Sequence, residues 1–241
     1  MPPKIPTQAD LAISLPLAAH FPNPPESTTA FLILFHGLGD SETPFAAFAR
    51  NLALPGVLAI AVRGTSPLAS LVGGDDDPRR YYHWGDDLAL DPQTGELDPD
   101  PGFETASRLV MEKLIRGVIV DKCGWETSDV MLFGFGQGGS LALGMAARLA
   151  ADGANARFKG VVSVGGALPM SMVSSRSGRG KGATHALLCQ VGEEGEESAR
   201  REFQDVAVVR WARREVGMPT SREEAFPIIK FFADRLKDGW V

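Results

Sequence analysis

The segment 134–138, with the sequence GFGQG, has the glycine spacing of a turn that can present a catalytic nucleophile. It lies between an apolar run and a helical pattern. In a G-x-S-x-G turn at such a place, the backbone takes a positive φ and raises a serine hydroxyl above the edge of a sheet. Here the serine position is occupied by Gly136. Because glycine takes positive φ at little cost and has no side-chain oxygen, we expect the turn to persist without its nucleophile.

The order of the histidines argues against a catalytic base. When a serine lies on such a turn, its acid and then its histidine follow it along the chain. The last histidine is His185, which immediately precedes a predicted strand, and His20, His36 and His83 all precede Gly136. We therefore predict structural roles for the histidines and no catalytic residue at this turn.

Three other side chains could in principle replace the missing serine. Ser140 lies about one helical turn after Gly136, Ser41 lies in a loop after an apolar run, and Cys189 lies within a predicted strand. Such weak nucleophiles require a neighbouring base, and the sequence places none beside them.

Metal-assisted chemistry is a further alternative. His83 with Asp86 and Asp87 offers a histidine and two carboxylates, a set that suits zinc or iron, and the segment 193–197 contains four glutamates. Neither group has a regular ligand spacing, and acidic loops are usually solvated. We predict no metal site and no cofactor.

Short apolar runs alternate with helical patterns along the chain. Strands are predicted at 30–35, 56–62, 129–134, 158–164, 186–191 and 206–211, and helices at 44–53, 103–120, 140–151 and from about 221 to 236. Thr43 before Pro44 predicts the start of the first helix. This alternation predicts an α/β fold with a mostly parallel central sheet and helices on both faces. We expect one domain over 1–241, with an extended N-terminal segment at 1–25 and long loops at 69–101 and 171–183.

Composition limits the partners and the location. The chain is 44% hydrophobic and 22% charged, as in ordinary globular domains. Its net charge of -6 argues against a nucleic-acid partner, since such binding needs clustered Lys and Arg. Cys123 and Cys189 lack metal-type spacing and fit a reducing compartment. No secretory signal or membrane-spanning run is visible, so we expect a cytoplasmic location, with the nucleus also open.

Four motifs carry a family resemblance. FHGLGDS (35–41), AVRGTSPL (61–68), YHWGDD (82–87) and GFGQGGSLAL (134–143) resemble, in order and spacing, the acyl-protein thioesterase and carboxylesterase family of α/β-hydrolases. The resemblance spans nearly the whole chain and implies the α/β-hydrolase fold.

The resemblance also implies roles for individual residues. The HGLGD loop, which contains Gly37, and the residue after the nucleophile would supply oxyanion amides, at Leu38 and Gln137. His83 and Trp84 would belong to an aromatic wall of the ligand site.

Two further family positions are also vacant. The family's acid position falls on Gly195, with Glu193 or Glu194 as neighbours that a small shift could bring into place. The segment that matches the family's histidine loop, 216–220, contains no histidine.

These observations favour a catalytically impaired pseudo-hydrolase that binds a small acyl or ester ligand, or a protein partner, without turnover. The alternative is an active carboxylic-ester or thioester hydrolase, similar to an acyl-protein depalmitoylase, with relocated catalytic groups. A third hypothesis is a scaffold whose loops 73–101 and 172–181 contact another protein. The sequence identifies neither the ligand nor the oligomeric state.

Overall fold

The computed structural model describes residues 3–68, 81–88, 97–153, 155–173 and 180–237. Within them a seven-stranded sheet has the order β1-β3-β2-β6-β7-β8-β9. All neighbouring strands are parallel except β1 (Leu17–His20), which pairs antiparallel with β3. The parallel strands are β2 (Ala30–Phe35), β3 (Val57–Val62), β6 (Val130–Phe135), β7 (Gly160–Val164), β8 (Ala186–Gln190) and β9 (Val206–Arg210). The predicted mostly parallel sheet is confirmed.

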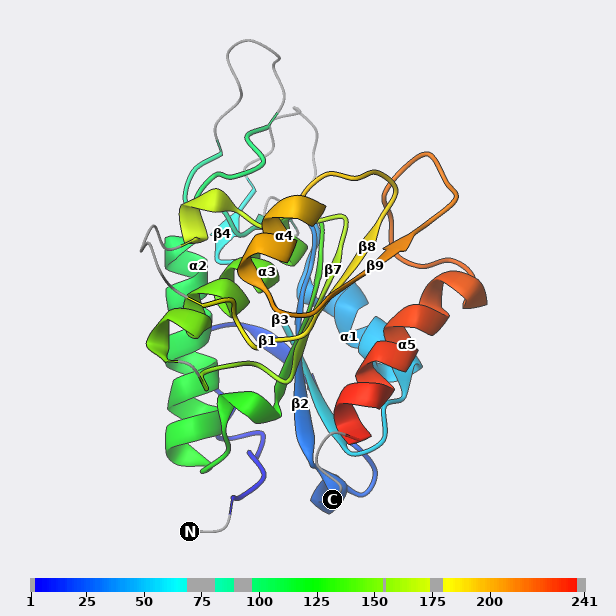
Figure 1. Cartoon of the computed structure of the whole chain (residues 1–241). Helices are drawn as coiled ribbons and strands as arrows, with labels where there is room; N and C mark the ends of the chain where they lie inside the picture. The colour runs from blue at the N-terminus through cyan, green and yellow to red at the C-terminus, as the bar shows by residue number, and fades with distance from the viewer. Residues whose placement is uncertain (1–2, 69–80, 89–96, 154, 174–179, 238–241) are drawn as a thin grey trace, which may run out of the picture.

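Helices cover both faces of the sheet (Figure 1). One face is covered by α2 (Glu104–Leu109), the π-helix η3 (Val110–Lys122) and α3 (Gln137–Leu149). The other face is covered by α1 (Glu42–Leu52) and α5 (Arg222–Lys237). A short helix, α4 (Glu196–Glu202), follows β8 and contacts β9.

The packing of strand β2 on both of its faces explains why its sequence is apolar throughout. Phe31, Ile33 and Phe35 belong to the core beneath α2, η3 and α3, whereas Leu32 and Leu34 belong to the core beneath α1 and α5. Successive side chains point to opposite faces, so a strand covered on both faces needs apolar residues at every position. The apolar runs therefore predicted the central strands correctly.

Helix starts were predicted less well. Helix α1 begins at Glu42, with Ser41 as an N-cap that makes no side-chain hydrogen bond, so the predicted start at Thr43 and Pro44 is wrong. Asp40 Oδ1 instead accepts from the Ser41 amide at 2.7 Å. Helix α3 begins at Gln137, one residue after the turn, rather than at 140.

Two further features were not predicted. The strand β1 lies within the segment 1–25, which the sequence indicated only as extended. The helical pattern at 103–120 continues beyond α2 as η3, in which hydrogen bonds reach five residues back, as from the Cys123 amide to Val118 O at 3.0 Å. Its apolar positions Val110, Leu114 and Val118 are buried, as the spacing predicted.

The carboxyl ends of the parallel strands meet at one edge of the sheet. The loops that follow β2, β6, β7 and β8 therefore converge there, which is where α/β proteins bind ligands. No helix among the described residues is long and apolar enough to cross a membrane. Parts of the two predicted long loops, 69–80, 89–96 and 174–179, lie outside the described residues.

Candidate functional site

The turn between β6 and α3, which we call the elbow, has the predicted backbone shape. Gly136 has φ 51° and ψ -121°. Its amide donates to Val164 O at 2.8 Å, and its carbonyl accepts from the amides of Gly139 and Ser140. A Cβ placed on Gly136 would meet no atom within 4 Å. The elbow is therefore preserved, and the space that a side chain would take is open.

Glycines let three backbone segments pack against each other at the elbow. A Cβ on Gly138 would lie 2.4 Å from His36 O and 2.5 Å from Phe35 O. A Cβ on Gly166, in the loop after β7, would lie 2.4 Å from Gly136 O. The elbow is thus held between the loop after β2 and the loop after β7.

Two backbone amides at this place are available to an acceptor. Within the described residues, neither the Leu38 amide nor the Gln137 amide donates a hydrogen bond. Gln137 is the first residue of α3, where the helix dipole adds partial positive charge. Gly37 packs against the ring of Phe135, with 2.7 Å between its hypothetical Cβ and Cδ1, which brings the loop after β2 to the elbow. Such amides can stabilise an oxyanion.

Trp84 and Gln137 brace the loop after β2. The Trp84 indole Nε1 donates to His36 O at 2.8 Å, and the Trp84 amide donates to the Gln137 side-chain Oε1 at 2.8 Å. The Trp84 ring is fully buried and packs against Phe35 and His36. Its place is beneath the loop, whereas the sequence placed it in a ligand-facing wall.

Both ring nitrogens of His36 have hydrogen-bond partners. Nε2 accepts from the Gly64 amide at 2.8 Å, and Nδ1 lies 2.7 Å from Gly37 O, to which it donates in the neutral tautomer. Burial lowers the pKa of His36, and the Gly37 carbonyl opposes that shift. His36 is therefore a neutral structural residue rather than a base.

The other three histidines also make no catalytic contact among the described residues. His185 pairs with Asp205 at 2.6 Å, at the start of β8 and β9. His20 ends β1, at the opposite edge of the sheet from the elbow. His83 in β5 (Tyr82–His83) is buried, and this burial lowers its pKa. Its side chain makes no hydrogen bond to a serine, cysteine or carboxylate among the described residues.

The acid position holds no carboxylate in a catalytic setting. Gly195 has φ 76°, is the N-cap of α4 and packs against Ala167. Glu193 is 88% exposed and lies 3.6 Å from Arg210. Glu194 lines a small cavity of about 150 Å³ beside Val216. Glu194 is therefore the carboxylate that shares a cavity with a residue of the segment that matches the family's histidine loop.

The segment 216–220 is held in place without a histidine. Val216 packs on Gly165, whose hypothetical Cβ would lie 2.1 Å from Val216 Cγ1. The Arg213 guanidinium donates to the carbonyls of Gly217 and Met218 and pairs with Glu224 at 3.2 Å. It also lies 4.2 Å above the Trp211 ring. Arg213 therefore holds this loop in place.

The alternative nucleophiles are poorly placed. Burial raises the pKa of the Cys189 thiol to about 12, so the thiol stays protonated. Ser140 is buried within α3, and Ser41 caps α1. No hydrogen bond joins either hydroxyl to a histidine among the described residues.

The acidic residues have structural partners. Asp86 accepts from the Glu104 and Thr105 amides at 2.7 and 2.9 Å and so caps α2. Glu196 pairs with Arg200 and Arg210. In the described part of the chain, no group of three or more His, Cys, Asp or Glu side chains is arranged to hold a metal ion.

A half-buried ion pair beside the site was missed from the sequence. Glu42 receives two hydrogen bonds from Arg63, at 2.8 and 2.5 Å, and Arg63 lies 5.0 Å above the Tyr82 ring. The pair joins α1 to the segment after β3, and Arg63 also contacts β5. Its only sequence signal is an arginine immediately after an apolar strand.

Comparison with protein families gives one match. A family model described as phospholipase/carboxylesterase matches residues 19–193. An uncharacterized hydrolase of Schizosaccharomyces pombe is 29% identical over 218 residues, which are 85% of this chain and 83% of that protein. An uncharacterized hydrolase of Mycosarcoma maydis is 33% identical over 144 residues, which are 57% of this chain and half of that protein.

Solved structures share the fold. Acyl-protein thioesterase 2 of Zea mays superimposes with a TM-score of 0.66 at 18% identity, over 92% of this chain and 99% of that one. Esterase PE8 gives a TM-score of 0.62 at 17% identity, over 92% and 98% of the two chains. These similarities show the α/β-hydrolase fold.

Proposed function

The chain belongs to the phospholipase/carboxylesterase family, and on that premise we propose that it is a pseudo-hydrolase that binds a small acyl or ester ligand without turnover. The observation that carries the proposal is Gly136, which has the φ of 51° of a nucleophile elbow and open space in place of a side chain. Nucleophilic catalysis requires an attacking group and a base to activate it. Neither is found at the elbow among the described residues.

Ligand binding is supported by the two amides and by apolar side chains exposed at the same edge of the sheet. The amides of Leu38 and Gln137 are the donors that a carbonyl oxygen would meet. Seven large apolar side chains are exposed among the described residues, and five of them lie in loops at the carboxyl edge of the sheet. These five are Leu38, Tyr81, Leu97, Met170 and Val216. An apolar rim with few polar donors is typical of a small-molecule site.

A titration with methyl octanoate, followed by backbone-amide NMR, tests the binding. We expect saturable shifts at Leu38 and Gln137 and no release of octanoate. The absence of shifts at both amides would refute ligand binding at the elbow.

A hydrolysis panel tests the impairment. Purified wild-type protein is assayed with octanoyl esters and thioesters beside Gly136→Ser. Even a site without its triad can retain about 10³ to 10⁴-fold acceleration over water, against a loss on the order of 10⁶. We therefore expect only trace rates, and turnover at an ordinary enzymatic rate would eliminate the proposal.

The second candidate is an active ester or thioester hydrolase with relocated groups. It is favoured by the intact elbow and by the two amides. Its candidates are Ser41, Ser140, Glu193 and His83. If wild-type turnover is found and survives the change of each of these singly to alanine, this candidate has no mechanism left.

The remaining parts of the proposal concern the whole chain. We propose that 1–241 is one domain. Its support is that a single seven-stranded sheet runs through the described residues and has one apolar core on each face. A cytoplasmic location, and a protein partner in place of the ligand, follow only from the sequence. Nucleic acid is not proposed as a partner because the net charge is -6.

A further inference from the structure

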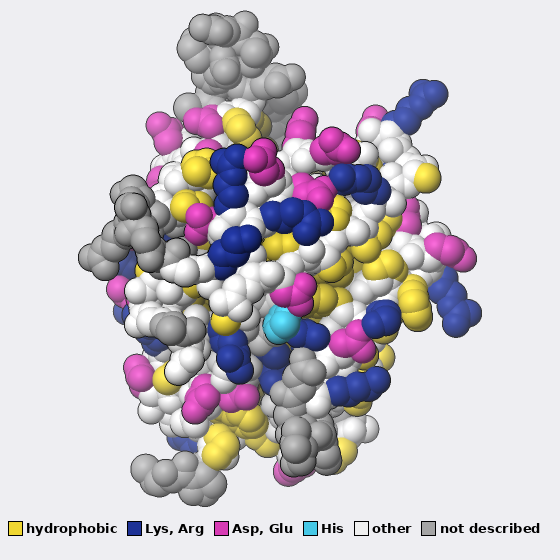
Figure 2. All heavy atoms as spheres, viewed as in Figure 1, with side chains coloured by type: hydrophobic (Ala, Val, Ile, Leu, Met, Phe, Trp, Pro, Cys, Tyr) yellow, Lys and Arg dark blue, Asp and Glu magenta, His cyan; other side chains and the backbone are white. Residues whose placement is uncertain are grey.

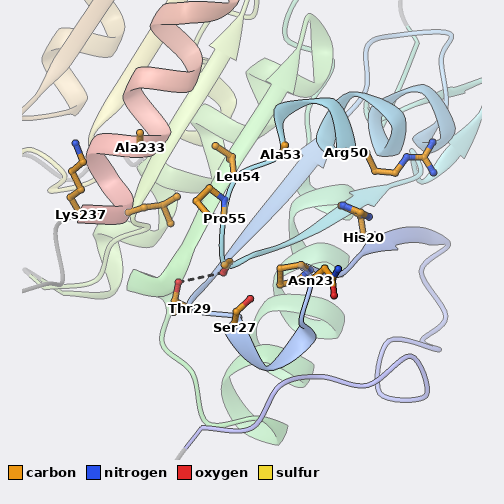
Figure 3. Close-up of a pocket in the computed structure, with 13 residues that line it drawn as sticks. His20, Asn23, Ser27, Thr29, Arg50, Ala53, Leu54, Pro55, Ala233 and Lys237 are labelled. Carbon is orange, nitrogen blue, oxygen red and sulfur yellow. Dashed lines mark hydrogen bonds between the residues drawn. The ribbon is translucent and has the colours of Figure 1, made fainter.

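A cavity of about 740 Å³ lies at the opposite edge of the sheet from the elbow (Figure 3). It is formed by the turn between α1 and β3, by the segment that leads into β2, and by the last turns of α5. Strands β2 and β3 begin beside it, whereas the elbow follows the end of β6. Its volume lies within the range of small-molecule sites, and it is separate from the proposed ester site.

The floor of this cavity, which we call the amino-edge cavity, is apolar. Leu54 and Pro55 come from the turn after α1, and Ala233 and Leu236 come from α5. A smaller cavity of about 30 Å³ also contacts Leu54 and is lined by Leu32, Ala49, Val57 and Ala59. The apolar lining of the larger cavity therefore continues towards the core.

One wall of the cavity is fixed by backbone hydrogen bonds. The amide and Oγ1 of Thr29 both donate to Gly56 O, at 2.8 and 3.3 Å (Figure 3). Gly56 has φ 68°, and a Cβ on it would lie 2.9 Å from Ser27 O. Gly56 allows the turn after α1 to pack directly on the segment before β2. The wall is formed before any ligand binds.

The charged side chains that line the cavity are cationic. In the described part of the chain, its titratable lining residues are His20, Arg50 and Lys237, and no carboxylate lines it, although Asp234 on α5 interacts with Lys237 from outside the lining. Among the described residues, no acidic group lies within ion-pair distance of these three side chains, whereas Arg63, Arg148 and six other arginines have such partners. Figure 3 shows His20 and Arg50 on one side of the cavity and Lys237 on the other.

We propose that the amino-edge cavity binds a small amphiphile with one anionic group, a carboxylate or a phosphate ester, on an apolar body. The apolar body covers Leu54, Pro55 and Leu236. The Arg50 guanidinium binds the anionic oxygens, because its planar donors match two oxygens at once. Lys237 adds positive charge at the other side of the entrance.

Backbone-amide NMR with three probes of equal chain length tests the proposal. Decanoate and decyl phosphate carry the two anionic groups, and 1-decanol is the neutral control. We expect saturable shifts at 53–56 and 233–236 with one or both anions, and binding of the alcohol weaker by about tenfold or more. The stronger anion identifies the headgroup.

Matched variants separate this cavity from a general charge effect. Arg50→Gln should weaken anion binding by about tenfold, since it removes a charged hydrogen bond. Lys113→Gln removes the same charge from an exposed, unpaired position on η3, across the sheet, and should leave the affinity unchanged. Ala233→Phe should fill the cavity and abolish the shifts at 53–56, while circular dichroism confirms the fold.

Equal affinity for 1-decanol and the anions, or unchanged binding by Arg50→Gln, would overturn the proposal. So would anion-induced shifts confined to Leu38 and Gln137, which report the elbow. Because the two sites have different reporter amides, failure here leaves the ester-binding proposal standing, and the reverse also holds.

Discussion

At the scale of single residues, glycines decide both the shape and the chemistry of the elbow. The vacancy at Gly136 and its positive φ could be predicted, because the G-x-G-x-G spacing lies between a strand and a helix. The contacts of Gly138 and Gly166 could not, because they depend on how closely segments distant in sequence approach. The acid position was uncertain for the same reason: only the folded loop shows that Glu194, rather than Gly195, lines the cavity beside Val216.

The two elbow glycines should respond differently to a methyl group. Gly136→Ala points its Cβ into open space, so only the cost of positive φ applies, about 1–3 kcal/mol of unfolding free energy. Gly138→Ala places a Cβ 2.4 Å from the His36 carbonyl oxygen, so it should cost more or prevent folding. Urea denaturation of the pair measures this, and equal losses would show that the elbow is not packed as described.

His36 should resist protonation. Burial lowers its pKa in the folded state, so below about pH 6.5 the unfolded chain binds a proton that the folded chain does not. The unfolding free energy contributed by this residue should therefore fall as the pH drops below that value. NMR titration of the imidazole should show a neutral ring with a proton on Nδ1 at pH 6.5. A ring that is mostly protonated there would contradict the assigned tautomer.

At the scale of elements, the sequence predicted those whose signal is local. Strands β2 and β3 are apolar at every position because helices cover both faces, and the predicted ends of all six parallel strands lie within two residues of the observed ones. The edge strand β1 has no such pattern, since its pairing with β3 depends on tertiary contact. The start of α1 was misplaced because Thr43 and Pro44 fit a first helical turn as well as a cap.

Trp84 should stabilise the loop after β2 more than a typical indole hydrogen bond does. Trp84→Phe leaves the buried His36 carbonyl without its donor, and we expect a loss of about 1–3 kcal/mol of unfolding free energy. Trp125→Phe is the matched control, because Trp125 Nε1 donates to the exposed Lys4 carbonyl, which water can reach. Thermal or urea unfolding should show a smaller loss of unfolding free energy for Trp125→Phe than for Trp84→Phe. The opposite order would contradict the proposed role of Trp84 in holding the loop.

At the scale of the whole molecule, the two ends of the sheet differ in character. The carboxyl edge carries the elbow, the free amides and the apolar rim, whereas the amino edge carries the cationic cavity. Figure 2 shows acidic and basic side chains interspersed over one face of the molecule. This mixture agrees with the sequence, which indicated no dedicated basic surface.

Catalysis should return when the vacant positions are refilled. Val216 is 40% exposed and shares a cavity with Glu194, so Gly136→Ser with Val216→His supplies a nucleophile at the elbow and an imidazole beside a carboxylate, within the segment that matches the family's histidine loop. General-base assistance contributes about 10²–10⁴-fold, so the double variant should hydrolyse octanoyl esters at least about 100 times faster than Gly136→Ser. The control is Gly136→Ser with Met218→His, because Met218 packs against the core beneath α5. Equal rates for the three variants would show that an imidazole at residue 216 does not act as the base.

The absence of a reactive nucleophile is tested most directly by the mass of the intact wild-type protein after incubation with a fluorophosphonate. The double variant Gly136→Ser with Val216→His serves as the positive control and should gain one adduct. The wild-type chain is predicted to keep its unmodified mass. A stoichiometric adduct on the wild type, mapped to a side chain at the carboxyl edge of the sheet, would show that a reactive nucleophile is present there and would contradict the proposed pseudo-hydrolase.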